Sequence, residues 1–242
     1  MKTVLVTGAD RGLGFSLCVE FLRRDYLVFA GQFLAGWPEL KHLECHHQGR
    51  LVIVPLDIGN DLSIERAQAV IAEHTAVLDV LVHNAGIIGG EDGFSTGVRA
   101  EENRNVFNVN SMGPVCVTRY FLPMMEEGSR KICFVSSEAG SISLAHRDGM
   151  TGYCMSKAAL NMAVRILNND LGKRGYEIRL YHPGWMRTYM EGGELMNGEL
   201  EPEVSAREAV RYFLKQALID VALAHTPVFC RFFHGFLPVK AL

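Results

Sequence analysis

Residues 2–14, KTVLVTGADRGLG, place a short β-branched apolar run directly before a glycine-rich turn and the start of a helical pattern. Glycine permits a tight backbone turn and close approach to a pyrophosphate, and a helix N-terminus offers unpaired N–H groups and its positive dipole end to the anion. A strand, a glycine turn and a helix in this order are what dinucleotide binding requires. Glycine turns also occur in loops that bind nothing, so the rest of the chain must supply the context.

The rest of the chain repeats this alternation of strand and helix. Short apolar runs predict strands at residues 3–7, 27–31, 51–56, 80–83, 132–136, 177–182 and 228–232. Apolar residues at three- and four-residue steps predict helices at residues 13–24, 62–73, 100–126, 152–174 and 205–222. We therefore expect an α/β fold: a single domain over residues 1–242 with a doubly wound parallel sheet of about seven strands and helices on both faces. The loops at 87–97 and 189–202 follow carboxyl ends of predicted strands, where such sheets bind substrates.

The composition is that of an ordinary globular protein. The chain has 242 residues, of which 48% are hydrophobic and 21% charged. A chain of this size buries about 70 to 75% of its unfolded surface, so it needs no disulfide or structural metal to hold a core. Its net charge of −3, without a run of like charge, argues against a nucleic-acid partner. The six cysteines are scattered without a Cys-x-x-Cys pair, which indicates free thiols in a reducing compartment.

The sequence also predicts where the protein resides. The most apolar long segment, residues 218–239, contains Asp220, Pro227 and Arg231, and these interruptions exclude a membrane-spanning helix. Strand-like residues begin at Lys2, so we expect no removable signal or transit peptide. The prediction is a cytoplasmic protein with no membrane partner.

A tyrosine and a lysine at the start of the predicted helix 152–174 carry the strongest chemical signal. Tyr153 and Lys157 are four residues apart, so they share one helix face. A nearby ammonium group favours the ionised phenol and lowers its pKa from about 10, which suits a group that exchanges protons at neutral pH. An isolated surface contact between tyrosine and lysine is common, so this pair gains its weight from the motifs around it.

Four further motifs occur in order along the chain. They are Asn84-Ala85-Gly86 after the fourth predicted strand, Asn110 in the helix 100–126, Ser136-Ser137 at the end of the fifth strand, and Pro183-Gly184 after the sixth. Each alone could be a turn or a buried polar residue that bonds its own backbone. Four motifs in one order are much harder to explain as separate accidents.

With the spacing Gly-x-x-x-Gly-x-Gly of residues 8–14, these motifs resemble the short-chain dehydrogenase/reductase family over nearly the whole chain. The segments SKAALNM (156–162), HPGWMRT (182–188) and GFLP (235–238), together with a long interval between serine and tyrosine, are similar to one branch of it. That branch holds the C-factor-like and sniffer-like carbonyl reductases. The resemblance implies a Rossmann fold and an oxidoreductase that transfers a hydride between a nicotinamide cofactor and a carbonyl or alcohol.

The resemblance also implies a role for each catalytic residue, namely Asn110, Ser137, Tyr153 and Lys157. Tyr153 would give its proton to the substrate oxygen, and Ser137 would hydrogen-bond that oxygen, with Ser136 as the alternative serine. Lys157 would hold the nicotinamide ribose as well as acting on Tyr153. The carbonyl of Asn110 would hold a water that relays protons from the lysine.

The cofactor site implied by the resemblance extends along the carboxyl ends of the strands. Its expected residues are Gly8, Asp10, Arg11, Gly12, Leu13, Gly14, Gln32, Asp57, Ile58, Asn84, Ala85, Gly86, Tyr153, Lys157, Pro183, Gly184, Trp185, Met186 and Thr188. An NAD site usually has an acid at the end of the second strand, where this chain has Gln32. Arg11, just before Gly12, occupies the basic position typical of members that use NADP. We therefore expect NADP(H) to be favoured over NAD(H).

Three points remain open at this stage. The substrate is expected to be a small carbonyl compound or alcohol, apolar because of Trp185, Met186, Tyr189 and Met190. The family implies a homodimer or homotetramer through the helices 100–126 and 152–174, although monomers occur in the branch. The alternative function is a regulatory protein that senses the NAD(P) redox state without significant turnover, and the complete set of catalytic residues favours the enzyme.

One cluster contains residue types that often bind metals. His42, Cys45, His46 and His47 crowd a polar stretch, but their spacing fits no familiar metal site. We interpret them as a solvated helix end or loop and expect no metal.

Overall fold

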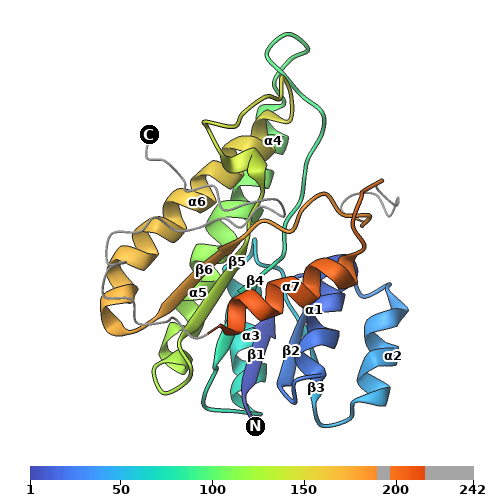
Figure 1. Cartoon of the computed structure of the whole chain (residues 1–242), viewed down its shortest axis with the longest axis vertical. Helices are drawn as coiled ribbons and strands as arrows, with labels where there is room; N and C mark the ends of the chain where they lie inside the picture. The colour runs from blue at the N-terminus through green and yellow to red at the C-terminus, as the bar shows by residue number, and fades with distance from the viewer. Residues whose placement is uncertain (190–196, 216–242) are drawn as a thin grey trace.

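Six parallel strands form one sheet in the order β3-β2-β1-β4-β5-β6 (Figure 1). A computed structural model describes residues 1–189 and 197–215 of the chain. The strands are β1 (Thr3–Val6), β2 (Leu27–Gln32), β3 (Leu51–Pro55), β4 (Val80–His83), β5 (Lys131–Val135) and β6 (Glu177–Tyr181). The predicted strand at 228–232 lies outside the described residues. The α/β class and the parallel sheet are confirmed, with each of the six observed strands within a residue of its predicted start.

Helices cover both faces of the sheet, because its central strands are buried on both sides. Every residue of β1, β4 and β5 is buried, which explains their nearly continuous apolar sequences. One face packs against α1 (Gly12–Leu22), α2 (Pro38–His46) and α7 (Pro202–Leu214), and the other against α3 (Asp61–Ala72), α5 (Gly113–Met125) and α6 (Thr151–Leu171). The two resulting cores contain the largest fully buried side chains, among them Phe21 and Phe213 on the first face and Phe121 on the second.

The strand order reverses between β1 and β4. From β1 the chain winds outward through β2 and β3, and it then returns to the other side of β1 to form β4, β5 and β6. At such a reversal, the loops that leave two neighbouring strands diverge and open a crevice beyond their carboxyl ends. The glycine turn after β1 and the loop after β4 therefore face each other across this crevice.

The predicted helix 100–126 is the clearest correction to the sequence analysis. It consists of α4 (Ala100–Phe107), a π-helical turn (Asn108–Met112) and α5. The helical period runs through all three, so the sequence pattern did not reveal the π turn. In the structure Asn110 is drawn inward to bond Ile87 and Ser156, contacts from distant segments that local spacing cannot show.

One helix was missed by the prediction, and the start of another differs from it. Helix α2 was not predicted, because only Leu40 of its nine residues is buried and the rest of the segment is polar. Helix α7 starts at Pro202, before the predicted start at 205, because proline suits the first turn of a helix. The predicted continuation beyond residue 215 lies outside the described residues. Over residues 1–189 and 197–215, every helix falls short of what crossing a membrane would require.

Candidate active site

The glycine turn has a conformation that side chains would obstruct. Gly8 and Gly12 have φ values of 62° and 54°, in the left-handed region that favours glycine. A Cβ at Gly8 would lie 2.7 Å from Cα of Ala85, so a side chain there would collide with the loop after β4. At Gly14, a Cβ would collide with the carbonyl oxygen of Gly8. At these glycine positions the backbone before α1 is therefore not covered by side chains.

The N-terminus of α1 is available to an anion. Arg11 is its N-cap residue, the Arg11 side chain makes no capping hydrogen bond, and the first turn contains no acid. By contrast, Asn60 caps α3 by accepting a hydrogen bond from the backbone N–H of Ser63. Uncapped N–H groups and the positive end of the helix dipole favour a phosphate group at α1.

Asn84 fastens the glycine turn to the loop after β4. Its side-chain amide donates to the carbonyl oxygens of Thr7 and Gly8, at 3.0 and 2.9 Å. In return, the Thr7 hydroxyl oxygen accepts the backbone N–H groups of Asn84 and Ala85 at 3.0 and 3.1 Å. Thr7 was not among the predicted site residues, and the two bonds that its hydroxyl oxygen accepts show why a threonine serves at that position.

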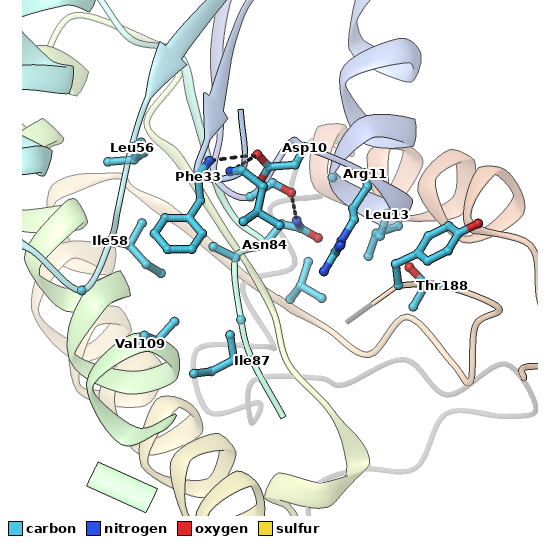
Figure 2. Close-up of a pocket in the computed structure, with 18 of the residues that line it drawn as sticks. Asp10, Arg11, Leu13, Phe33, Leu56, Ile58, Asn84, Ile87, Val109 and Thr188 are labelled. Carbon is cyan, nitrogen blue, oxygen red and sulfur yellow. Dashed lines mark hydrogen bonds between the residues drawn. The ribbon is translucent and has the colours of Figure 1, made fainter. Parts of the chain in front are cut away.

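A cavity of about 470 Å³ opens at this crevice (Figure 2). The predicted residues that line it are Gly8, Asp10, Arg11, Leu13, Gly14, Asp57, Ile58, Asn84, Ala85, Gly86, Tyr153, Lys157, Pro183, Met186 and Thr188. It also takes in residues that the sequence analysis missed, including Phe33, Leu34, Leu56, Ile87 and Val109. Four predicted cofactor residues are not part of its lining: Gly12, Gln32, Gly184 and Trp185. Gly12 instead packs against Thr188, and Trp185 is 65% exposed.

Asp10 shapes the end of the cavity beyond β2. Its Oδ1 atom accepts the backbone N–H groups of Phe33 and Leu34 at 2.9 and 2.7 Å, as the dashed line to Phe33 in Figure 2 shows in part. These bonds turn Phe33 and Leu34 toward the cavity, at the place where Gln32 was expected to contact the cofactor. Burial raises the pKa of Asp10, and the hydrogen bonds from Leu34 and Phe33 oppose that effect.

Arg11 reaches from the glycine turn into the space between Asn84 and Thr188 (Figure 2). Its guanidinium lies 4.8 Å from the ring centre of Trp37, which in turn lies 5.1 Å from the ring of Tyr189. Within the described residues, Arg11 thus has a cation–π contact with Trp37 and no salt bridge with a carboxylate. Its charge stays available to an anionic ligand.

Tyr153 and Lys157 lie together in the lining of the same cavity. The Lys157 ammonium lies 5.8 Å from the Tyr153 ring centre and donates to the carbonyl oxygen of Val135 at 3.3 Å. Burial lowers the pKa of Lys157 to about 8. Burial also raises the pKa of Tyr153 to about 12, although a hydrogen bond with Ser137 opposes the rise. The predicted lowering of the Tyr153 pKa is wrong for this geometry, because burial outweighs the Ser137 hydrogen bond and the charge of Arg147, and Glu138 adds to the rise.

Asn110 is fully buried behind this pair. Its side chain donates to the carbonyl oxygen of Ile87 and accepts the Ile87 backbone N–H, at 2.8 and 2.9 Å, and also donates to the Ser156 hydroxyl at 3.0 Å. A Cβ at Gly86 would lie 3.2 Å from Oδ1 of Asn110 and 3.6 Å from Nζ of Lys157. The π turn thus places Asn110 next to the lysine.

The two serines after β5 have different surroundings. Ser136 donates to the side-chain oxygen of Asn161 at 2.7 Å, which engages its hydroxyl away from the tyrosine. Ser137 has the hydrogen bond with Tyr153 and also donates to a carboxylate oxygen of Glu138 at 2.8 Å. Ser136 lies in the cavity lining, whereas Ser137 is the serine whose hydrogen bond acts on the pKa of Tyr153, so the choice of Ser137 stays a prediction. Glu138 was not predicted, since nothing in its local sequence distinguishes it from a surface acid.

The described residues contain no group of three or more histidine, cysteine or acidic side chains that could hold a metal ion. His42, Cys45 and His46 lie on α2, whose exposed side carries them. The chemical groups in the cavity lining include the phenol of Tyr153, the ammonium of Lys157, the guanidinium of Arg11, a serine hydroxyl and the carboxylates of Asp10 and Asp57. Together with a glycine-lined helix N-terminus, they define the site of a dinucleotide-dependent enzyme of the Rossmann class.

The chain belongs to the short chain dehydrogenase family, whose model it matches over residues 2–196. Estradiol 17-beta-dehydrogenase 2 of Mus musculus is 30% identical over 209 residues, which cover 84% of this chain. The chain spans only about half of that relative, 53% of its length. C-signal of Myxococcus xanthus is 40% identical over 119 residues, covering 49% of this chain and 71% of that protein.

Solved structures give the same result for the fold. Carbonyl reductase Sniffer of D. melanogaster superimposes with a TM-score of 0.80 at 27% identity, over 89% of this chain and 92% of that one. A carbonyl reductase from Pseudomonas aeruginosa in complex with NADP has a TM-score of 0.75 at 31% identity, over 87% and 90% of the two chains. The similarity to C-signal and to Sniffer confirms the branch that the sequence motifs indicated.

Proposed function

We propose that this protein is an NADP(H)-dependent carbonyl reductase or alcohol dehydrogenase. One observation carries the proposal: a single cavity is lined both by the glycine turn with Arg11 and by Tyr153 with Lys157. A site that only stored a dinucleotide would not need a half-buried phenol and a buried ammonium beside each other. When bound, the nicotinamide cofactor would supply or accept the hydride.

The residues of the chain would manage the proton and the charge on the substrate oxygen. In the direction of reduction, Tyr153 donates its proton to that oxygen, and Ser137 hydrogen-bonds the same atom. A phenol whose pKa is raised keeps its proton at neutral pH, so it is ready to act as an acid. Lys157 and Asn110 lie next to each other at Gly86, where they can hold the cofactor ribose and pass a proton inward.

The preference for NADP(H) rests on Arg11 and on the end of β2. Arg11 is the cationic side chain that extends into the cavity from the glycine turn, where Asp10 also lines the cavity, and its contact with the Trp37 ring leaves its charge for a phosphate. The residues that line the cavity after β2 are Phe33 and Leu34, neither of which can bind a ribose diol as an acid does. A relative whose structure is described in complex with NADP supports the same cofactor.

The substrate class follows from the side chains that follow β6. Met186 and Tyr189 line the cavity with Ile87 from the loop after β4, so an apolar or aromatic carbonyl compound suits it. Met190, expected to contribute, lies outside the described residues. The carbonyl reductases among the similar structures support this class of substrate.

The oligomeric state proposed from the family uses helices α4, α5 and α6. Phe107, Met112 and Val115 are 40, 46 and 43% exposed, as are Met155 and Met162 at 52 and 54%. We propose that this apolar surface joins two copies of the chain in a homodimer or homotetramer. Sedimentation equilibrium would give the mass, and a monomer at all concentrations would refute the proposal.

The function is tested by NADPH oxidation with a panel of aliphatic and aromatic aldehydes and ketones. We expect turnover of at least one aromatic member, and its loss in Tyr153→Phe with NADPH affinity retained. Tyr120→Phe is the matched control, because Tyr120 lies on α5 beside Arg119, away from the cavity lining. Undiminished turnover in Tyr153→Phe would refute the assignment, and tight NADPH binding with no turnover of any substrate in either direction would favour the regulatory alternative.

A further inference from the structure

The start of α6, the helix that carries Tyr153, has no cap from its own segment. Its N-cap residue is Met150, whose side chain makes no capping hydrogen bond. The backbone of Met150 has φ 55° and ψ 42°, in the left-handed region that a residue other than glycine rarely adopts. Tyr153 is the third residue of the helix and lies in this first turn. The turn therefore depends on contacts from elsewhere in the chain.

Asp92, from the loop after β4, supplies such a contact. Its Oδ1 atom accepts the backbone N–H of Thr151, the first residue of α6, at 3.0 Å and from 59 positions away. A carboxylate at a helix N-terminus satisfies an unpaired N–H group and faces the positive end of the helix dipole. Asp92 thus caps α6 from a distant segment.

The other carboxylate oxygen of Asp92 fixes α4 at the same point. Oδ2 accepts the backbone N–H of Arg99, the N-cap residue of α4, at 3.0 Å and the side-chain amide of Asn103 at 2.8 Å. The hydrogen bonds from Asn103 and Arg99 lower the pKa of Asp92, so it is ionised at neutral pH. Its side chain is only 3% exposed, so water competes little for these charge-assisted bonds.

Glycines let the loop and the two helices approach each other closely. A Cβ at Gly93 would lie 2.7 Å from the carbonyl oxygen of Asp148, so the loop after β4 lies directly against the segment before α6. A Cβ at Gly152 would collide with the side-chain oxygen of Asn103, so α4 packs tightly against the start of α6 (Figure 1). Asp92 lies where the loop and the two helices meet.

We propose that Asp92 is a positioning residue of this active site: its carboxylate caps α6 from the loop after β4 and so holds Tyr153 in place. The inference deepens the catalytic role proposed for Tyr153 and rests on it. Among the described residues that line the cavity Asp92 is absent, so it acts through the position of the tyrosine and not by contact with cofactor or substrate. The loop 87–97, expected to bind substrate, would thus also support the acid–base residue.

The first experiment is amide hydrogen exchange measured by NMR on the full chain. The Thr151 N–H reports the bond to Asp92, and the Cys154 N–H, which donates to the Met150 carbonyl oxygen at 3.0 Å, reports the first turn of α6. Both amides should exchange at least about tenfold faster in Asp92→Ala. The effect should be smaller in Asp92→Asn, which keeps the shape of the side chain and one accepting oxygen.

The first turn of α3 is the internal reference for exchange. There the Ile64 N–H donates to the Asn60 carbonyl oxygen at 3.1 Å, and its exchange should change much less than that of Cys154. Unchanged exchange at Cys154 in Asp92→Ala would overturn the proposal. Equal acceleration at Cys154 and Ile64 would also overturn it, because Asp92 would then contribute only to global stability.

The second experiment compares turnover with that of a matched carboxylate at the opposite end of the sheet. Asp79 precedes β4 and accepts the backbone N–H groups of Thr3 and Ser129 at 2.9 and 3.0 Å. With 4-nitrobenzaldehyde, at a temperature where all variants are folded, Asp92→Ala should lose about tenfold in kcat with NADPH affinity unchanged. Asp92→Asn should lose less, and Asp79→Ala should keep the wild-type kcat. Equal kcat in Asp92→Ala and Asp79→Ala would overturn the positioning role.

The two experiments separate this inference from the proposed function, because hydrogen exchange needs no turnover. Faster exchange at Thr151 and Cys154, in a protein that turns over no carbonyl compound, would support Asp92 as the cap of α6 and refute the enzyme. Turnover by the wild type, with unchanged exchange at Cys154 in Asp92→Ala, would support the enzyme and overturn the inference.

Discussion

Replacement of Lys157 by methionine should stabilise this protein while it removes its activity. Lys157 is 4% exposed, and burial lowers the pKa of its ammonium from 10.5 to about 8. At about 1.4 kcal/mol for each pH unit, retaining the charge in this place costs the folded state about 3 kcal/mol at neutral pH. Methionine has a similar length and no charge, so it fills the same space without this cost.

The net gain is smaller than that cost, because the variant loses the hydrogen bond from Lys157 to the Val135 carbonyl oxygen. A bond of this kind contributes about 1 kcal/mol. The expected increase in the free energy of unfolding is thus about 2 kcal/mol, or about 4 to 8 °C in Tm for a chain of this length. Functional residues that destabilise the fold are common where a charge must be kept in a buried site.

The pH dependence of the gain gives the sharpest test. The folded state disfavours the ammonium, so between about pH 8 and 10.5 the unfolded chain binds the proton and the folded chain does not. The stability of the wild-type protein relative to Lys157→Met is therefore lowest below pH 8 and recovers as the pH rises toward 10.5. Urea denaturation at a series of pH values measures this difference. A destabilised variant, or a gain that is the same at pH 7 and pH 10, would show that the buried Lys157 charge does not lower the free energy of unfolding.

Three other substitutions test the contacts that shape the cavity. Asn84→Ala should lower the Tm and weaken NADPH binding about tenfold, because the carbonyl oxygen of Gly8 loses its donor. Calorimetric titration measures the NADPH affinity, and an unchanged affinity would contradict this expectation. Arg11→Ala should weaken NADPH binding at least about tenfold and leave NADH binding nearly unchanged, and an unaltered NADPH/NADH ratio would exclude a phosphate contact. Asp92→Asn should lower the Tm and the turnover rate, because Asp92 accepts the backbone N–H of Thr151 at the start of α6. Thermal unfolding measures the Tm and NADPH oxidation measures the turnover rate. If neither quantity changes, Asp92 does not support the start of α6 as we expect.

Much of the fold could be predicted because its strands are buried on both faces. A fully buried strand such as β5 needs a nearly continuous apolar run, and the run that follows Lys131 is visible in the sequence. Helix α2 is held by one buried leucine, so its sequence has no apolar stripe to recognise. The π turn at Asn110 depends on Ile87 and Ser156, which come from other segments. Local patterns cannot report contacts of that kind.

The site divides in the same way. The glycine turn, Asn84, Tyr153 and Lys157 occur as ordered motifs, and the structure brings them to one cavity. Phe33 reaches the cavity only because Asp10 holds the backbone after β2, a contact between residues 23 positions apart. Glu138 contacts Arg147 from the segment before α6 and His182 after β6, so its neighbours come from two distant segments. Such roles arise from tertiary packing and leave no local signature.

Calorimetric titration of the purified protein with NADPH and then with NADH is the sharpest test of the cofactor assignment, since it requires no knowledge of the substrate. We expect one NADPH site per chain and weaker binding of NADH, because Arg11 is the cation that extends into the cavity from the glycine turn. Tighter binding of NADH would contradict the cofactor assignment. Binding of neither dinucleotide by a folded sample would contradict the proposed function as a whole.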